Sequence, residues 1–216
     1  MATVSGTARL DLGRLLMVPV AGLIFVFNVR ALAQGGTHGA AGALRLFGAV
    51  LTCAFYALII WCYLRRGAAS ATSRSVTAHT AAVVATWTPV VFSMLRGTPP
   101  GAGQQGVSDL LLIVGTTWSL WSLRFLGRNI SVLAQARGLA DRGPYRWVRH
   151  PLYAGEIIAS LGLAVAANSL AAAAVWLGIC GLQAYRAVRE EQLLLTTLPG
   201  YRAYRGRTAA LLPGIF

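Results

Sequence analysis

Lysine is absent from this chain of 216 residues, and acidic residues are scarce. All 19 basic residues are arginine, Asp and Glu together number six, and 12% of the residues are charged while 56% are hydrophobic. A soluble domain carries roughly twice that charged fraction, so the composition indicates a protein surrounded by lipid. The net charge of +13 does not indicate nucleic-acid binding, because the arginines gather between apolar runs, as membrane anchors do.

Cysteine is also rare, and the positions of the three cysteines exclude two kinds of site. Cys53, Cys62 and Cys180 all lie inside apolar runs without CxxC spacing, so we expect neither a disulfide framework nor a metal site. No small-residue cleavage site follows the first apolar run, which we therefore interpret as a retained helix and not a signal peptide.

Six apolar segments, each near the ~20 residues that a helix needs to cross a bilayer, dominate the chain. They are Leu15–Gln34, Leu46–Leu64, Thr77–Leu95, Val107–Leu126, Pro151–Asn168 and Leu170–Val188. Backbone groups must be paired in lipid, which favours helices. We predict an all-α, polytopic membrane helical bundle with five to six transmembrane helices. The last two should form a tight hairpin, because only Asn168 and Ser169 are clear turn residues between them.

The distribution of arginines predicts the orientation of this bundle. With the N-terminus in the cytoplasm, 16 arginines fall on the cytoplasmic side, and three (Arg30, Arg45 and Arg96) fall on the other side. Such a bias is the usual signature of cytoplasmic loops. The Arg-only, Ala- and Gly-rich composition suggests a GC-rich genome. We therefore predict an integral protein of a bacterial cytoplasmic membrane, with both termini inside.

One glycine-rich motif is set aside. Residues 101–106 read GAGQQG, which satisfies the dinucleotide-binding pattern G-x-G-x-x-G. That pattern has a mechanism only between a strand and a helix. Here it follows two prolines between membrane segments, so we interpret it as a flexible loop on the outer face.

The stretch between the fourth and fifth segments, Arg142–Glu156, carries the most chemistry. It reads RGPYRWVRHPLYAGE and lies on the predicted cytoplasmic side. Pro151 suits the first turn of a helix, which places His150 at the helix start. Tyr153 and Glu156, three residues apart, then share one helical face.

A second polar cluster follows the sixth segment. Glu190 and Glu191 lie near a helix C-terminus, where the helix dipole disfavours negative charge unless a cation is close. The hairpin should return them to the neighbourhood of His150 and Tyr153. From chemistry alone, two interpretations stay open: a binding site, or an interfacial anchor of arginine and aromatic residues.

These residues resemble a known family. Arg149-His-Pro-Leu-Tyr153-Ala-Gly155, followed by Glu190-Glu191, is similar to the RHPxYxG…EE pattern of the isoprenylcysteine carboxyl methyltransferase and phospholipid methyltransferase group. The resemblance covers the chain from about residue 126 to the C-terminus. It implies S-adenosylmethionine as cofactor, held in a pocket near the cytoplasmic interface, and a lipophilic substrate that enters from the bilayer. We accordingly divide the chain into N-terminal transmembrane helices on the substrate side (1–106) and a methyltransferase-like catalytic region (107–216).

The chemistry of this cofactor suggests roles for the motif residues. A glutamate can pair with its ammonium group and an arginine with its carboxylate, and tyrosines can enclose its adenine. The predicted cofactor-binding residues are Tyr145, Arg149, His150, Tyr153, Gly155, Glu190, Glu191, Tyr201 and Tyr204. We assign no catalytic base, no oligomeric state and no metal, since the sequence offers no metal-ligand cluster.

Two other function classes compete with this interpretation. Membrane sterol and steroid reductases, which use NADPH, have a similar pattern in which Asn often replaces Leu152, and Gly155-Glu156 resembles that version. A non-catalytic scaffold or small transporter is the other class. The acceptor of the methyl group stays open between a carboxylate, a thiol and an amine. The segment Gly127–Gly138 is predicted to lie along the interface and to line the lateral entry of that acceptor.

Overall fold

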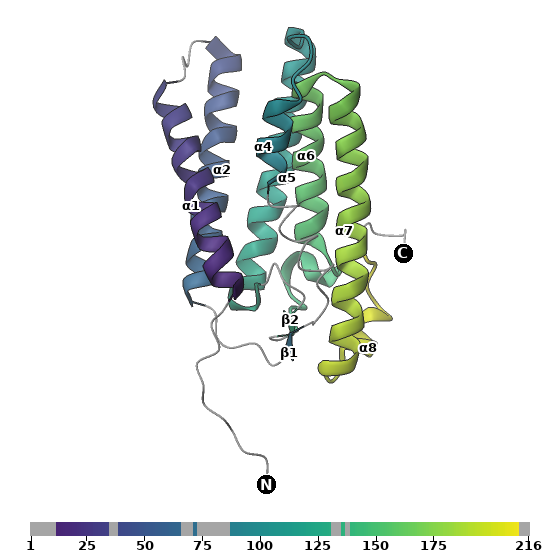
Figure 1. The fold of residues 1–216 in the computed structure, drawn as a ribbon. Helices are drawn as coiled ribbons and strands as arrows, with labels where there is room; N and C mark the ends of the chain where they lie inside the picture. Colours follow the sequence, from purple (N-terminus) through teal and green to yellow (C-terminus); the bar gives the residue numbers. More distant parts are fainter. Residues whose placement is uncertain are drawn as a thin grey trace.

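The computed structural model describes residues 12–34, 39–65, 71–72, 87–130, 135–136 and 139–211. In this part of the chain the architecture is a bundle of long helices (Figure 1). The helices are α1 (Leu12–Gln34), α2 (Gly39–Arg65), α4 (Thr88–Met94), α5 (Ala102–Leu126), α6 (Pro151–Ala167), α7 (Leu170–Thr197) and α8 (Tyr201–Arg205). The short elements are the 3-10 turns η1 (Gly127–Asn129) and η2 (Gly143–Arg146) and the strands β1 (Ala71–Thr72) and β2 (Gln135–Ala136). Among the described residues, the prediction of an all-helical fold is confirmed apart from the antiparallel pairing of these two-residue strands; the predicted number of five to six transmembrane helices stays a prediction.

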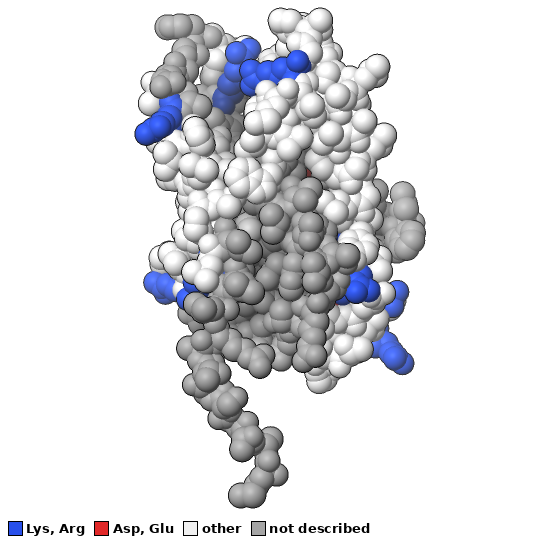
Figure 2. Space-filling model, in the orientation of Figure 1, with Lys and Arg blue, Asp and Glu red and all other residues white. Residues whose placement is uncertain are grey.

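Three of the helices are long and apolar enough to cross a membrane. They are α2, α5 and α7, whereas the apolar part of α1 (Met17–Arg30) and α6 are shorter. Only 6% of the apolar window of α2 is buried against the protein, so its surface suits lipid rather than water. On the face shown in Figure 2, arginines lie near the two ends of the bundle, and the described surface between them carries almost no charge. The molecule has the surface of an integral membrane protein.

Two sequence predictions fall largely outside the described residues. Of the third predicted segment, Thr77–Leu95, the structure describes the part from residue 87 onward, where α4 lies. Of the proposed interfacial segment, Gly127–Gly138, it describes η1, Ile130 and the two residues of β2.

Small residues let α5 and α6 approach each other closely. A Cβ atom on Gly115 would meet the backbone of Gly155 and Ala159, and one on Gly155 would meet the Ser119 hydroxyl. Further along the pair, the Ser108 hydroxyl donates to the Gly162 carbonyl at 2.8 Å. Packing of this kind is typical of membrane helices, where small side chains and interhelical hydrogen bonds replace the hydrophobic effect.

The turn between α6 and α7 is as short as predicted. Asn168 ends α6 in the left-handed conformation (φ 48°), and the Ser169 hydroxyl caps α7 by accepting from the Ala172 amide. The turn is also tied to the segment before α5, because Asn168 donates to Thr98 and Ser169 donates to the Leu95 carbonyl. This end of the bundle is therefore closed by polar contacts.

The prediction of a flexible loop at residues 101–106 is wrong. Ala102–Gly106 form the first turn of α5. Gln104 anchors that turn by donating to the Val165 carbonyl at 3.0 Å and to the Asn168 side chain at 2.9 Å. The glycines hid this helix start, since a run rich in glycine disfavours helix until such tertiary contacts fix it.

Candidate functional site

The motif begins with a turn that requires glycine. Gly143 has φ 59°, and the Phe125 ring occupies the space that a Cβ atom would need there. Pro144 follows in η2, and Pro151 opens α6, so the chain between them runs into the helix start with His150 at the N-cap. The segment that contains Ala209 and Ala210 lies beside this helix start. The amides of Arg149 and His150 donate to the carbonyls of Ala209 and Ala210 at 2.8 and 3.0 Å.

Glu191 lies at the centre of an ionic cluster. Its Oε1 accepts from Arg149 Nε at 2.7 Å and lies 3.2 Å from His150 Nε2, and its Oε2 lies 3.1 Å from Arg205 Nε. Arg149 also donates to the backbone carbonyls of Arg205 and Thr208. Because both Glu191 and Arg149 are buried, this cluster ties α6, α7 and the segment around α8 together.

Glu190 has a different environment from its neighbour. Its carboxylate accepts one hydrogen bond from the Tyr153 hydroxyl at 2.8 Å, and its side chain is 29% exposed, compared with 11% for Glu191. The Tyr153 ring stacks on the His150 ring, with 5.4 Å between centroids and 3° between planes. Glu190 is thus positioned by Tyr153, and His150 Nδ1 lies 3.9 Å from its Oε2. Among the described residues its carboxylate accepts no second hydrogen bond.

Three buried tyrosines form one wall of this region. Tyr204 donates from its hydroxyl to the Tyr145 carbonyl at 2.8 Å, and the Tyr201 and Tyr204 rings lie 5.8 Å apart. Burial raises the pKa of Tyr204 to about 12, and it raises the pKa values of Tyr145 and Tyr201 further above the ordinary value. The three hydroxyls therefore stay protonated, and that of Tyr204 donates the hydrogen bond to Tyr145. The Tyr201 hydroxyl is buried and has no hydrogen-bond partner among the described residues.

The structure brings eight of the nine predicted site residues to this end of the bundle. They are Tyr145, Arg149, His150, Tyr153, Glu190, Glu191, Tyr201 and Tyr204. Gly155 lies two residues further along α6 and faces α5, where its lack of a side chain permits helix packing. A cofactor-binding role for any of the nine stays a prediction.

Sequence reasoning missed three polar residues beside this cluster. Arg205 pairs with Glu191, as described above. Gln183 and Arg186 lie on α7, which continues through Thr197, nine residues beyond the predicted end of the sixth segment. Gln183 and Arg186 precede Glu190 by seven and four residues, so all three share one helical face. That spacing is visible in the sequence, where Arg186 is one of the 16 arginines on the predicted cytoplasmic side.

The described residues contain no group of three or more His, Cys, Asp and Glu side chains that could hold a metal ion. The arrangement offers instead a buried ion-pair cluster, an adjacent carboxylate with spare capacity, and a wall of tyrosine hydroxyls. A bound ligand with polar and cationic parts would give hydrogen-bond partners to the Tyr201 hydroxyl and to the Glu190 carboxylate.

Two comparisons with known proteins bear on this site. Residues 104–197 match the model of a family described as phospholipid methyltransferase, and this confirms the predicted family resemblance. Over 117 residues the chain is 34% identical to the cobalt-zinc-cadmium resistance protein CzcN of Cupriavidus metallidurans. That match covers 50% of this chain and 51% of CzcN, so the chain spans about half the length of this relative.

Proposed function

We propose that this chain, whose residues 104–197 match the phospholipid methyltransferase family, is an integral membrane methyltransferase that uses S-adenosylmethionine. The observation that carries the proposal is that the matched region contains Arg149, His150, Tyr153 and both glutamates, which converge at one end of the bundle. Among them, Glu190 is held by Tyr153 at 2.8 Å with one side open. Bound S-adenosylmethionine would supply a methyl group on a positively charged sulfur.

The residues present fit such a cofactor. Its ammonium group needs a carboxylate, and Glu190 has the free capacity that Glu191 lacks. Its polar atoms need donors, and the buried Tyr201 hydroxyl is without a partner among the described residues. We therefore assign the ammonium contact to Glu190. Both glutamates lie near the His150 ring, Glu190 at 3.9 Å from Nδ1 and Glu191 at 3.2 Å from Nε2. Adjacent helical residues point about 100° apart, however, so one ammonium group is assigned to one glutamate.

Arg149 and His150 act through their neighbours in this proposal. The Arg149 guanidinium donates its hydrogen bonds to Glu191 and to two backbone carbonyls. It therefore positions α7 and the segment around α8, and it does not bind the cofactor carboxylate. His150 contacts Glu191 and stacks on Tyr153, which fixes the hydroxyl that orients Glu190. A charged cluster held in this way is preorganised, because its groups do not have to rearrange when a cationic ligand arrives.

The acceptor is a lipophilic molecule that enters from the bilayer, and the site faces the cytoplasm. The apolar surface of α2 and the arginine distribution support this assignment. Methyl transfer is an in-line displacement, and aligning the donor with the acceptor in a dry site supplies much of its rate.

Calorimetric titration of the detergent-solubilised protein tests the proposed function. We expect saturable binding of S-adenosylhomocysteine, and we expect none for NADPH. Glu190→Gln should weaken the binding at least about tenfold, since a charge-assisted hydrogen bond contributes about 1.5–3 kcal/mol. Binding of NADPH without S-adenosylhomocysteine would place the protein with the reductases and overturn the proposal.

A further inference from the structure

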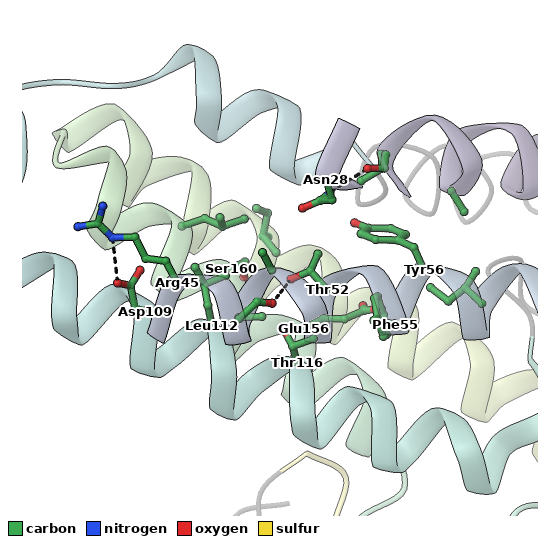
Figure 3. A pocket seen from close by; sticks show the side chains of 18 of the residues that line it. Asn28, Arg45, Thr52, Phe55, Tyr56, Asp109, Leu112, Thr116, Glu156 and Ser160 are labelled. Atoms are coloured by element: carbon green, nitrogen blue, oxygen red, sulfur yellow. Dashed lines mark hydrogen bonds and ion pairs between the residues drawn. The ribbon is translucent and has the colours of Figure 1, made fainter. Parts of the chain in front are cut away.

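A cavity of about 370 Å³ lies beside the candidate cofactor site, within the range typical of small-molecule pockets. It is lined by α1 and α2 on one side and by α5, α6 and α7 on the other (Figure 3). On α2 its lining extends from Leu44 to Ile59, which corresponds to about 22 Å along the helix axis at 1.5 Å per residue. The cavity is therefore elongated and runs along the bundle.

Much of the cavity lining is apolar, with Ile24, Leu112 and Phe55 among its residues. Two of its hydroxyl groups are turned back onto their own helices: Thr52 donates to the Gly48 carbonyl at 2.9 Å, and Ser160 donates to the Ile157 carbonyl at 3.0 Å. Hydroxyls satisfied in this way make little demand on a ligand, so this lining suits a hydrocarbon chain.

The wall of the cavity formed by α6 and α7, near the candidate cofactor site, is polar. Glu156 accepts from Gln183 Nε2 at 2.6 Å, and Gln183 Oε1 accepts from Arg186 at 2.8 Å. The Arg186 guanidinium lies 4.7 Å from the centre of the Tyr153 ring, whose hydroxyl donates to Glu190. Polar groups thus connect the cavity wall to the carboxylate assigned to the cofactor.

One end of the cavity is marked by a different pair. Arg45 Nε lies 3.6 Å from Asp109 Oδ2, and the Arg45 side chain is 60% exposed (Figure 3). The contacts between α5 and α6 place Glu156 near the level of Thr116, about two helical turns along α5 from Asp109. An acceptor with one reactive head and one apolar tail can therefore lie with its head at Glu156 and its tail along the apolar lining.

We propose that this cavity binds the methyl acceptor, a single-tailed lipophilic molecule whose attacking atom carries a proton, and that Glu156 takes that proton. This inference rests on the proposed methyltransferase function. Glu156 is the acidic residue on the wall of the cavity formed by α6 and α7. An amine or thiol can donate a hydrogen bond to its carboxylate, whereas an acceptor carboxylate has no proton to donate to it.

The step balances without any further reagent. The lone pair of the acceptor nitrogen or sulfur forms a bond to the methyl carbon, and the carbon–sulfur bond of the methyl donor breaks. The electron pair of the broken bond stays on the donor sulfur, which becomes neutral. The proton of the attacking atom moves to the Glu156 carboxylate. A carboxylate acceptor would have no proton to transfer and would need no such group.

Photo-crosslinking tests the cavity without turnover. Hexadecylamine carrying a diazirine in its tail is added to the protein in lipid nanodiscs without cofactor, and the adducts are mapped by mass spectrometry. We expect adducts on cavity-lining residues of α1, α2 and α5, competed by excess hexadecylamine. Ala49→Leu, which narrows the cavity, should abolish these adducts. Ala54→Leu, on the exposed side of the same helix, should not. Adducts confined to the outer surface in both variants would overturn the assignment of the cavity.

Turnover tests the role of Glu156 with three acceptors of matched chain length: hexadecylamine, hexadecanethiol and hexadecanoic acid. We expect methylation of the amine or the thiol. Glu156→Gln should lower that rate by about 100-fold or more, the usual contribution of general base catalysis. S-adenosylhomocysteine affinity, measured beside it, should stay unchanged in this variant.

The outcomes separate the two proposals. Methylation of the acid, or an undiminished rate with the amine or thiol in Glu156→Gln, would refute the role of Glu156 while leaving the methyltransferase function intact. Failure of the wild-type protein to bind S-adenosylhomocysteine would refute the proposed function itself. Glu156→Asp keeps the carboxylate and should recover part of the rate, so a loss caused by misfolding of Glu156→Gln is recognised.

Discussion

Neutralising the two adjacent glutamates should have opposite consequences for stability and for ligand binding. Glu191→Gln removes a charge whose partner Arg149 has a side chain only 7% exposed. Leaving one member of a buried ion pair unmatched costs about 3–5 kcal/mol. The exposed partner Arg205 adds at most about 1 kcal/mol. For a chain of this size, a loss of about 3 kcal/mol corresponds to a fall of about 6–12 °C in Tm.

Glu190→Gln should leave Tm within about 4 °C of the parent, since its amide oxygen can still accept from Tyr153 and the expected loss is at most about 1 kcal/mol. Its affinity for S-adenosylhomocysteine should fall about tenfold to more than hundredfold. The measurements are thermal unfolding and calorimetric titration of both variants in the same detergent. Asp141→Asn, an exposed carboxylate outside the cluster, serves as the control. Equal Tm losses in the two glutamate variants, with equal affinities, would refute the division of roles.

Three further predictions follow from the packing, the tyrosines and the arginines. Gly155→Ala should lower the free energy of unfolding by about 1–3 kcal/mol because the added methyl group meets α5. Gly178→Ala places its methyl group in open space and should not lower it. Equal Tm values for the two variants would contradict the close packing of α5 and α6. Burial raises the pKa of Tyr204 from 10 to about 12. Its contribution to the free energy of unfolding should therefore be fully present below pH 10 and should be lost as the pH rises from 10 to 12. Unfolding midpoints measured against pH should fall less steeply in Tyr204→Phe than in the parent, and identical slopes would contradict this contribution. In a cysteine-free background, Gly101→Cys should be labelled only from outside and Gly206→Cys only from the cytoplasm; the reverse would invert the orientation.

Much of the site could be predicted because it depends on local sequence and on one short turn. Pro151 sets the start of α6, and Asn168 and Ser169 set the hairpin that returns α7 to the same end. Residues at the start of α6 and near the end of α7 must then lie close together. The convergence of His150, Tyr153 and the two glutamates required no knowledge of the rest of the fold.

The remaining features depend on contacts that sequence patterns do not encode. The difference between Glu190 and Glu191 arises from where the chain after α7 places Arg205 and the Thr208 carbonyl. The glycine-rich start of α5 becomes helical because Gln104 finds partners more than 60 residues away. The place of Arg186 beside the site could not be predicted, because in the sequence it resembles the neighbouring arginines that anchor the helix ends.

A structure of the protein with S-adenosylhomocysteine in a lipid nanodisc tests the central claim most directly. The account predicts the amino group of the ligand within hydrogen-bond distance of Glu190, and a polar ligand atom at the Tyr201 hydroxyl. Its sulfur should face the part of the cavity where Glu156 lies. Ligand density elsewhere in the bundle, or an amino group paired with Glu191 in place of Glu190, would contradict it.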